Sequence, residues 1–441
     1  MRRLGLIALL SAAASPSSAE PRRLTLPEAV ALALRAEPLV AEAHIAEGRS
    51  QLAVLRAQLD RVSLRIDGQL QELWSKSGIG TDPSPEGGLG LMNLSASLNV
   101  PIFSGLRVEA NVTRAQRLAG AASASLAQQR KDTALAVARA YWSVRRLGLI
   151  AEAQAATIAR LAEAEGVAEG RVRAGLAPPI DRNRATLRHL QQAAVLADLR
   201  GQLRENSAQL AVALGLSDEL SLTDAPTLAD SPLPPAQELL DGAHHCRPEL
   251  RNAQLQLAAQ QQAVRMARSN YFPQLSGFAL LQYGNNPYLT AVGARAPSSA
   301  VNPFANGLGN LQLGVSLSMN FFDTLHTFTA IRDAQHEEAR LAEELRRVGR
   351  VVEAEVRVAH ARLIHLHEQR APLVAARAVS ADNLTILAKR YQNGEALVIE
   401  FLDSQVDLAN VERQLADVTA QLQLASLELD GALGRVVGEE R

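Results

Sequence analysis

The chain has 441 residues, of which 45 are basic and 46 acidic, so its formal net charge at pH 7 is −1. This balance argues against a nucleic-acid-binding surface and against a polybasic membrane patch. Aromatic residues make up only 3% of the chain, too few for an ordinary globular core of this length, and alanine and leucine dominate instead.

The N-terminus has the pattern of a secretory signal. Two arginines precede a largely apolar run from Leu4 to Ala14, and Ser17-Ser18-Ala19 offers a small-residue cleavage site. We therefore expect residues 1–19 to be a signal peptide. Beyond it no run of about 18 apolar residues occurs, so any membrane segment should be β-structured. The single cysteine, Cys246, permits no intrachain disulfide.

Four segments have strand character, and we expect strands at about 63–74, 91–103, 273–284 and 310–322. The second and fourth alternate most regularly, as tilted outer-membrane strands do. The alternation predicts that Leu94, Leu98, Leu313 and Leu317 face lipid, whereas Asn93, Ser97, Gln312 and Ser316 face water. A half-buried soluble sheet is the alternative, but aromatic residues at the strand ends favour the membrane.

Four strands cannot close a barrel by themselves. An open strand edge in lipid leaves backbone groups unpaired, which costs several kcal/mol for each group. Membrane barrels begin at about 8 strands. The chain should therefore assemble from two, three or more copies.

Long helices follow the strand pairs. The 69 residues from Gly105 to Arg173 contain no proline and could form one helix of about 100 Å. Segments 24–62 and 181–213 could lie alongside it. A later segment has coiled-coil spacing, at Leu408, Val411, Leu415, Val418, Leu422, Ala425 and Leu429. A soluble four-helix bundle is the alternative for the helices alone, but it leaves the paired strands unexplained.

Much of the chain repeats at an offset of 219 residues. Ala213-Leu214-Gly215 matches Ala432-Leu433-Gly434, and the strand exit at 98–105 matches 317–324. The duplication predicts a first repeat at 20–216 and a second at 236–441. Four prolines mark residues 217–235 as the linker between them.

Three motifs together resemble the TolC-like outer-membrane efflux proteins, over nearly the whole mature chain. They are the opening Leu24-Thr25-Leu26-Pro27-Glu28-Ala29, the strand exit Pro101-Ile102-Phe103-Ser104-Gly105, and the second turn Arg390-Tyr391-Gln392-Asn393-Gly394 with Val398-Ile399-Glu400-Phe401-Leu402-Asp403. Two departures from the family pattern concern the detail of adaptor contact: Asn320 replaces the strand-exit proline in the second repeat, and Pro178-Pro179 stiffens the first turn.

The resemblance implies a mixed fold of α-helix and membrane β-strand. Three chains would each contribute four strands to a 12-stranded barrel, which continues into a long α-helical periplasmic barrel. It further implies a homotrimer in the outer membrane of a Gram-negative bacterium. This tunnel would export drugs, toxic compounds, metals or polypeptides, together with a periplasmic adaptor (a membrane fusion protein) and an inner-membrane pump.

The resemblance also implies that the turns at 174–181 and 393–400 form the periplasmic tip, where the tunnel narrows and the adaptor docks. Gly175 and Gly394 would supply the backbone turns. Asp181 and Tyr391 should lie at similar heights, and a hydroxyl-to-carboxylate hydrogen bond between them would help to keep the resting tunnel closed.

Glu400 and Asp403 lie three residues apart at a helix start and so share one face. They could simply complement the helix dipole. Alternatively, symmetry would repeat them around the tunnel axis as rings of negative charge that select and bind cations.

We find no catalytic constellation, cofactor motif or metal site, so the chain is not expected to be an enzyme. His244, His245 and Cys246 are adjacent and seldom converge on one metal. The segment Gly87-Gly88-Leu89-Gly90 is interpreted as a strand connection with no following helix, not as a phosphate loop. A periplasmic coiled-coil adaptor or a structural envelope protein remains an alternative function.

Overall fold

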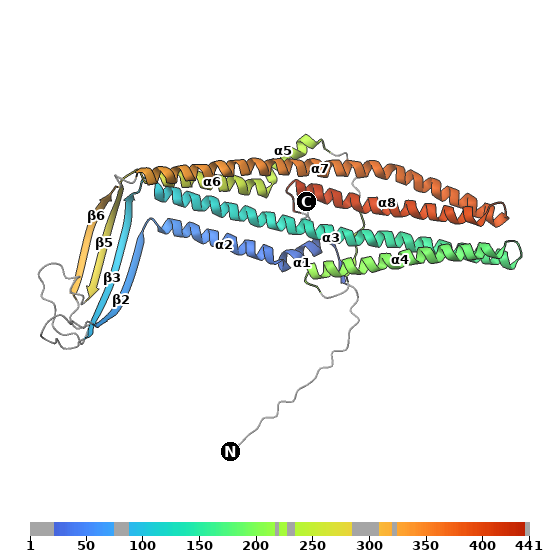
Figure 1. Cartoon of the computed structure of the whole chain (residues 1–441), viewed down its shortest axis with the longest axis horizontal. Coiled ribbons are helices and arrows are strands. Elements are labelled where there is room, and N and C mark those ends of the chain that lie inside the picture. The colour runs from blue at the N-terminus through green and yellow to red at the C-terminus, as the bar shows by residue number, and fades with distance from the viewer. Residues whose placement is uncertain are drawn as a thin grey trace, which may run out of the picture. The chain divides into compact units, whose positions relative to one another are not determined.

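The computed structural model of the chain describes residues 22–74, 88–216, 220–226, 234–284, 308–319 and 324–436 (Figure 1). The expected signal peptide lies outside these residues. The chain divides into two compact units. The hairpin unit comprises Met1–Glu42, Ala127–Arg247 and Arg350–Arg441, and the sheet unit comprises Ala43–Leu126 and Pro248–Gly349.

The sheet unit contains one antiparallel sheet with the strand order β2-β3-β5-β6. Its strands are β2 (Ser63–Trp74), β3 (Gly88–Phe103), β5 (Gln274–Gly284) and β6 (Leu308–Ser318). The interpretation of Gly88-Leu89-Gly90 as a connection is wrong. Gly88 pairs with Trp74 and Gly90 with Glu72 in an unbroken ladder, because glycine is compatible with extended backbone. Residues 320–322 of the fourth expected strand lie outside the described residues.

The register gives the sheet one apolar face. Leu98 pairs with Leu64 and Ala279, and Ala279 pairs with Leu313. On the opposite face, Ser276 and Ser316 lie side by side with their hydroxyl oxygens 2.8 Å apart. The two faces therefore carry the apolar and polar sets that the alternation predicted, and which face contacts lipid stays a prediction.

Four helices of the sheet unit adjoin the strands, two leading into a strand pair and two leaving one. They are α2 (Pro38–Leu59), α6 (Pro248–Ser269) and the first parts of α3 (Arg107–Arg173) and α7 (Thr324–Asn393). Between β3 and α3 the chain turns at Gly105, whose φ is +61°. A Cβ atom there would lie 2.9 Å from Cβ of Phe272, so the strand-exit glycine is required both by its conformation and by the close approach of Phe272.

The hairpin unit contains two long antiparallel hairpins. The first joins α3 to α4 (Pro179–Ala213), and the second joins α7 to α8 (Val398–Ala432). Two short helices, α1 (Leu26–Ala36) and α5 (Ala236–Cys246), belong to the same unit. Helix α1 begins with a capping box in which the Thr25 backbone N–H donates to the Glu28 carboxylate at 2.9 Å.

A small parallel sheet pairs β1 (Arg22–Leu24) with β4 (Leu220–Leu222). Strand β4 lies inside the 217–235 segment, which is thus not a simple linker. Next to this sheet Tyr141 is fully buried, and its hydroxyl donates to the Leu24 carbonyl at 3.1 Å. Burial, followed by the nearby charge of Asp224, raises the pKa of Tyr141 well above its ordinary value. This core fixes the N-terminal segment against the middle of α3.

None of the helices within the described residues combines the length and the apolar composition needed to cross a membrane.

Candidate functional site

The two hairpin turns have the same backbone conformation. Gly175 has φ +70° and Gly394 has φ +83°. In the first turn the Leu176 N–H donates to the Arg171 carbonyl at 2.8 Å, and in the second the Glu395 N–H donates to the Arg390 carbonyl at 2.8 Å. Both are Schellman endings in which glycine takes the left-handed position, the backbone role that the sequence assigned to these two glycines.

Tyr391 lies in an apolar cluster formed by all four hairpin helices. It is 2% exposed, and its ring stacks on Phe401 at 5.3 Å between centroids. Its hydroxyl makes no hydrogen bond within the described part of the chain. Burial raises the pKa of Tyr391, and the negative charge of Asp181 raises it further.

Asp181 therefore lies close enough to Tyr391 to influence it, although no hydrogen bond joins them within the described residues. Asp181 belongs to the first turn of α4, whereas Tyr391 belongs to the last turn of α7. The expected latch between them stays a prediction.

Arg171 connects the two turns, and the sequence reasoning missed it. Its guanidinium lies 4.9 Å from the centroid of the Tyr391 ring and donates to the carbonyl oxygens of Tyr391 and, at 2.8 Å, of Gln392. A cation over an aromatic ring with several carbonyl acceptors is a favourable, specific arrangement. The 219-residue repeat carried a signal, because Arg171 matches Arg390.

The two expected constriction carboxylates have different partners. Glu400 accepts a hydrogen bond from the Leu397 backbone N–H at 3.3 Å, as a helix-start residue does. Asp403 accepts a hydrogen bond from the Arg188 guanidinium at 3.1 Å. The Asp403 side chain is 53% exposed. Their role as a charged ring stays a prediction.

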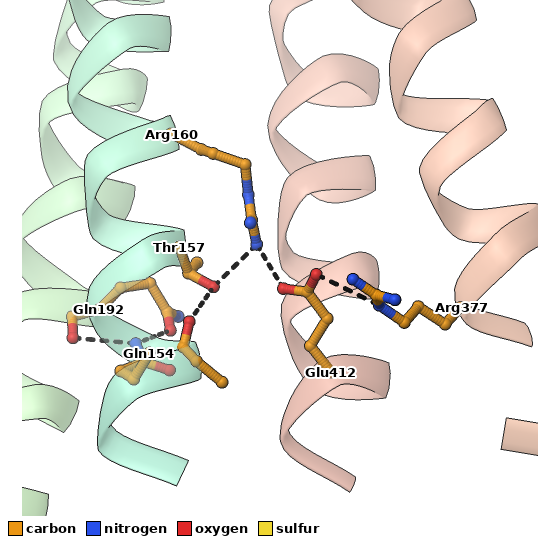
Figure 2. A network of polar contacts seen from close by, with 7 residues as sticks. Gln154, Thr157, Arg160, Gln192, Arg377 and Glu412 are labelled. Carbon is orange, nitrogen blue, oxygen red and sulfur yellow. Dashed lines mark hydrogen bonds and ion pairs between the residues drawn. The ribbon is translucent and has the colours of Figure 1, made fainter. Parts of the chain in front are cut away.

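Helix α8 is connected to both neighbouring long helices by two shared carboxylates, one of which, Glu412, is drawn in Figure 2. The Glu412 carboxylate accepts a hydrogen bond from the Arg160 guanidinium of α3 at 2.7 Å. Its other oxygen lies 3.7 Å from Nε of Arg377 on α7. Glu428 is likewise shared by Arg139 of α3 and Arg362 of α7, each at 2.9 Å. A carboxylate shared by two arginines favours one relative position of the two hairpins.

A second polar cluster joins α3 to α4. Glu165 accepts from the Thr186 hydroxyl at 2.6 Å and lies 2.7 Å from Nδ1 of His189. The hydrogen bond from Thr186, followed by that from His189, lowers the pKa of Glu165.

Within the described ranges, no group of three or more histidine, cysteine or acidic side chains could hold a metal ion. His244, His245 and Cys246 form the end of α5, where Cys246 is exposed.

An amphipathic four-stranded sheet together with two long helical hairpins defines a helical-tunnel subunit that contributes strands to a β-barrel. The sequence profile of the outer membrane efflux protein family matches residues 30–216 and 239–435. The chain belongs to this family. The two matched segments correspond to the two halves of the duplication.

Solved structures share this fold. The transmembrane channel CusC aligns with a TM-score of 0.77 at 16% identity, over 93% of this chain and 92% of its own. The outer membrane protein VceC from Vibrio cholerae aligns with a TM-score of 0.71 at 18% identity, over 93% and 96%. The Campylobacter jejuni outer membrane channel CmeC aligns with a TM-score of 0.73 at 13% identity, over 94% of this chain and 87% of its own. No functionally curated protein matches the sequence.

Family membership identifies the chain as an outer membrane efflux protein, with a transport function and no enzymatic one. Family membership excludes the two alternative functions that the sequence left open, a periplasmic adaptor and a structural envelope protein.

Proposed function

We propose that three copies of this chain associate head to tail into a tunnel that exports small molecules or polypeptides, after removal of residues 1–19. A periplasmic adaptor would dock at the turns containing Gly175 and Gly394 and would connect the tunnel to an inner-membrane pump. The observation that supports this proposal is that a single chain exposes two different apolar surfaces on its outer helices.

The first surface lies on α4. Ile180 and Leu187 are seven residues apart, Leu190 follows three residues later, and all three are more than half exposed. The second surface lies on α7, where Val379 and Ile386 are also seven residues apart and 60% and 54% exposed. Heptad spacing is typical of helices that pack against another helix. Helix α8, by contrast, is already largely buried within the chain.

Two different surfaces that complement one another produce a heterologous contact, which closes into a ring when the rotation permits. The sheet unit independently supports closure, because β2 and β6 are its edge strands and lipid does not tolerate unpaired edges. Three copies give 12 strands, within the range of membrane barrels.

The assembly is tested by placing a charge on each surface. We expect Leu187→Glu and Val379→Glu each to prevent assembly, because a buried unpaired carboxylate costs several kcal/mol at every interface. Thr385→Glu adds the same charge to an exposed position of α7 that lies about 100° around the helix from Ile386, outside the stripe, and serves as the matched control. Native mass spectrometry in detergent should show three chains for the parent and for the control. A trimeric Leu187→Glu variant would contradict the proposed contact.

At the tip, we propose that Asp181 and Tyr391 hold the resting tunnel closed and that Glu400 and Asp403 form its acidic constriction. A buried hydroxyl next to a carboxylate supports the first assignment, since bonds to charged groups contribute roughly 1.5–3 kcal/mol. Tyr391→Phe combined with Asp181→Ala should then raise the leak conductance of single channels. Unchanged conductance would argue against a latch.

The constriction has its own test. Glu400→Gln combined with Asp403→Asn should abolish both the preference for monovalent cations and the block by multivalent cations, because no carboxylates would remain on that face. Planar-bilayer recordings measure both properties in one experiment. If the assembled double variant retains them, the two carboxylates act only at the start of α8.

A further inference from the structure

Arg188 occupies a position that directly affects the charge of the proposed constriction. It lies on α4, and its Nη2 is 3.1 Å from Oδ1 of Asp403 on α8. The Arg188 side chain is 37% exposed and that of Asp403 53%, so both groups remain in contact with solvent. Glu400, one turn earlier in α8, has no arginine within ion-pair distance among the described residues.

We propose that Arg188 is a specificity-determining residue, a built-in counter-ion that reduces the cation preference of the constriction by pairing with Asp403. This inference rests on the proposed trimer and on its acidic constriction. Each copy brings two carboxylates and one guanidinium to the same level. The ring then carries a net charge of about −3 rather than about −6, and ring charge determines which ions enter a narrow pore.

The duplication supports a specific pairing of α4 with α8. At an offset of 219 residues, Arg184 and Arg188 of α4 match Asp403 and Asp407 of α8. The two repeats therefore carry opposite charges at two positions that are four residues apart on one helix face. Opposite charges on facing helices favour one register between them, and Arg188 with Asp403 forms the observed contact.

The pair also connects the two hairpins, because α4 belongs to the first and α8 to the second. Any movement that separates these helices at the tip exposes Asp403 without its counter-ion. Cation preference should then be greater in the open tunnel than in the resting one, without any new carboxylate being added.

The test measures the reversal potential and the trivalent-cation block, with hexaamminecobalt as the probe, for assembled channels in planar bilayers. Arg188→Gln should raise the cation-to-anion permeability ratio and lower the blocking concentration on the order of three- to tenfold. Arg184→Gln removes the same charge one turn away, and among the described residues Arg184 forms no ion pair. This control should change both quantities less than twofold.

A double-variant comparison separates the pair from a general charge effect. In the presence of Asp403→Asn, Arg188→Gln should have no further effect beyond that of Arg184→Gln, because the carboxylate that it unmasks is gone. Equal effects of Arg188→Gln with and without Asp403 would overturn the proposal.

Charge can also be changed after assembly, which removes any dependence on folding. Arg188→Cys in a Cys246→Ser background provides a single thiol for methanethiosulfonate reagents in the bilayer. A cationic reagent should restore the parent reversal potential, and an anionic reagent should shift it further toward cation preference. Identical responses to both reagents would exclude the counter-ion role.

The two proposals fail in different ways. If Glu400→Gln with Asp403→Asn abolishes selectivity but Arg188→Gln has no effect, the constriction stands and Arg188 is not its counter-ion. If the carboxylate variant keeps its selectivity, the constriction itself is wrong, and the role of Arg188 is overturned with it.

Discussion

The first and second hairpin turns share a backbone but differ in what their side chains contact. In each turn an arginine donates a hydrogen bond of 3.5 Å to a backbone carbonyl of the same turn. Arg171 donates to the Leu176 carbonyl, and Arg390 donates to the Glu395 carbonyl. Only Arg171 also reaches across to the other hairpin, where it covers Tyr391. Duplication thus preserved the fold of the turn, while later divergence produced contacts between the two copies.

The difference extends to the helices behind the turns. Glu165, Thr186 and His189 form a polar cluster in the first hairpin. The matching positions of the second hairpin are Leu384, Gln405 and Leu408, and Leu384 packs against the apolar cluster around Tyr391. Polar contacts therefore hold the first hairpin together at this level, whereas the second relies mainly on burial.

The largest expected difference between the turns concerns their arginines. Arg171→Ala should lower the free energy of local unfolding at the second turn by about 2–4 kcal/mol, because it removes charged hydrogen bonds and the cation over Tyr391. Arg390→Ala should cost less than about 0.5 kcal/mol, as exposed substitutions do. Hydrogen exchange of peptides covering residues 391–396 measures both. Equal losses of protection would show that the contact across the hairpins is not important.

The second-largest expected difference between the turns concerns the stability cost of replacing their glycines. Gly175→Ala and Gly394→Ala each place a side chain at positive φ, which costs about 1–2 kcal/mol. Gly394→Ala should cost more, since its Cβ would lie 3.3 Å from Nη2 of Arg171, whereas open space surrounds Gly175. Hydrogen exchange at each turn gives the two values. In an Arg171→Ala background the two costs should become equal, and a persisting difference would point to another cause.

The prolines should have a smaller effect. Pro178 and Leu397 precede the two returning helices with similar backbone angles, φ −71° and −78°. Pro178→Ala should destabilise the first turn by about 0.4–1 kcal/mol, because the unfolded chain gains freedom. Leu397→Pro should leave stability nearly unchanged. The proline restricts the unfolded chain, which stabilises the fold, but it also removes the hydrogen bond from the Leu397 N–H to Glu400. Exchange rates at the two turns check this, and strong destabilisation by Leu397→Pro would mean that the Glu400 cap dominates.

The smallest expected effect is a pH dependence confined to the first hairpin. The pKa of Glu165 is lowered below its ordinary value of 4.5, so its stabilising contribution is present above about pH 4.5 and is lost as the pH falls through the folded-state pKa. Hydrogen exchange, corrected for its intrinsic pH dependence, should show the first hairpin loosening in acid more than the second. Glu165→Gln should abolish this difference.

Much of the fold could be predicted from local patterns. Period-two alternation located β2, β3 and β6 to within a few residues, β5 was placed mainly by analogy with β2, and the proline-free run located α3. The family resemblance placed both turns, and a glycine at positive φ is a local requirement of each. The short pairing of β1 with β4 escaped prediction, since three-residue strands are too short to carry a periodic signal.

The candidate site was predictable only in part. Asp181, Tyr391, Glu400 and Asp403 were proposed from the sequence and their roles stay predictions, whereas Arg171 and Arg188 were missed because their partners lie more than 200 residues away in the sequence. A long arginine side chain on a helix has the same local pattern whether it extends into solvent or reaches a carbonyl of another helix.

The sequence by itself therefore determined the elements of this protein: duplicated halves, amphipathic strands, long helices and glycine turns. Each follows from the periodicity or backbone preference of neighbouring residues. The tertiary structure decided which charges meet, with Asp403 paired to Arg188 and Glu412 shared between two hairpins. Such pairing depends on the rotation and register of packed helices, which arise from the whole set of buried contacts and not from any single segment.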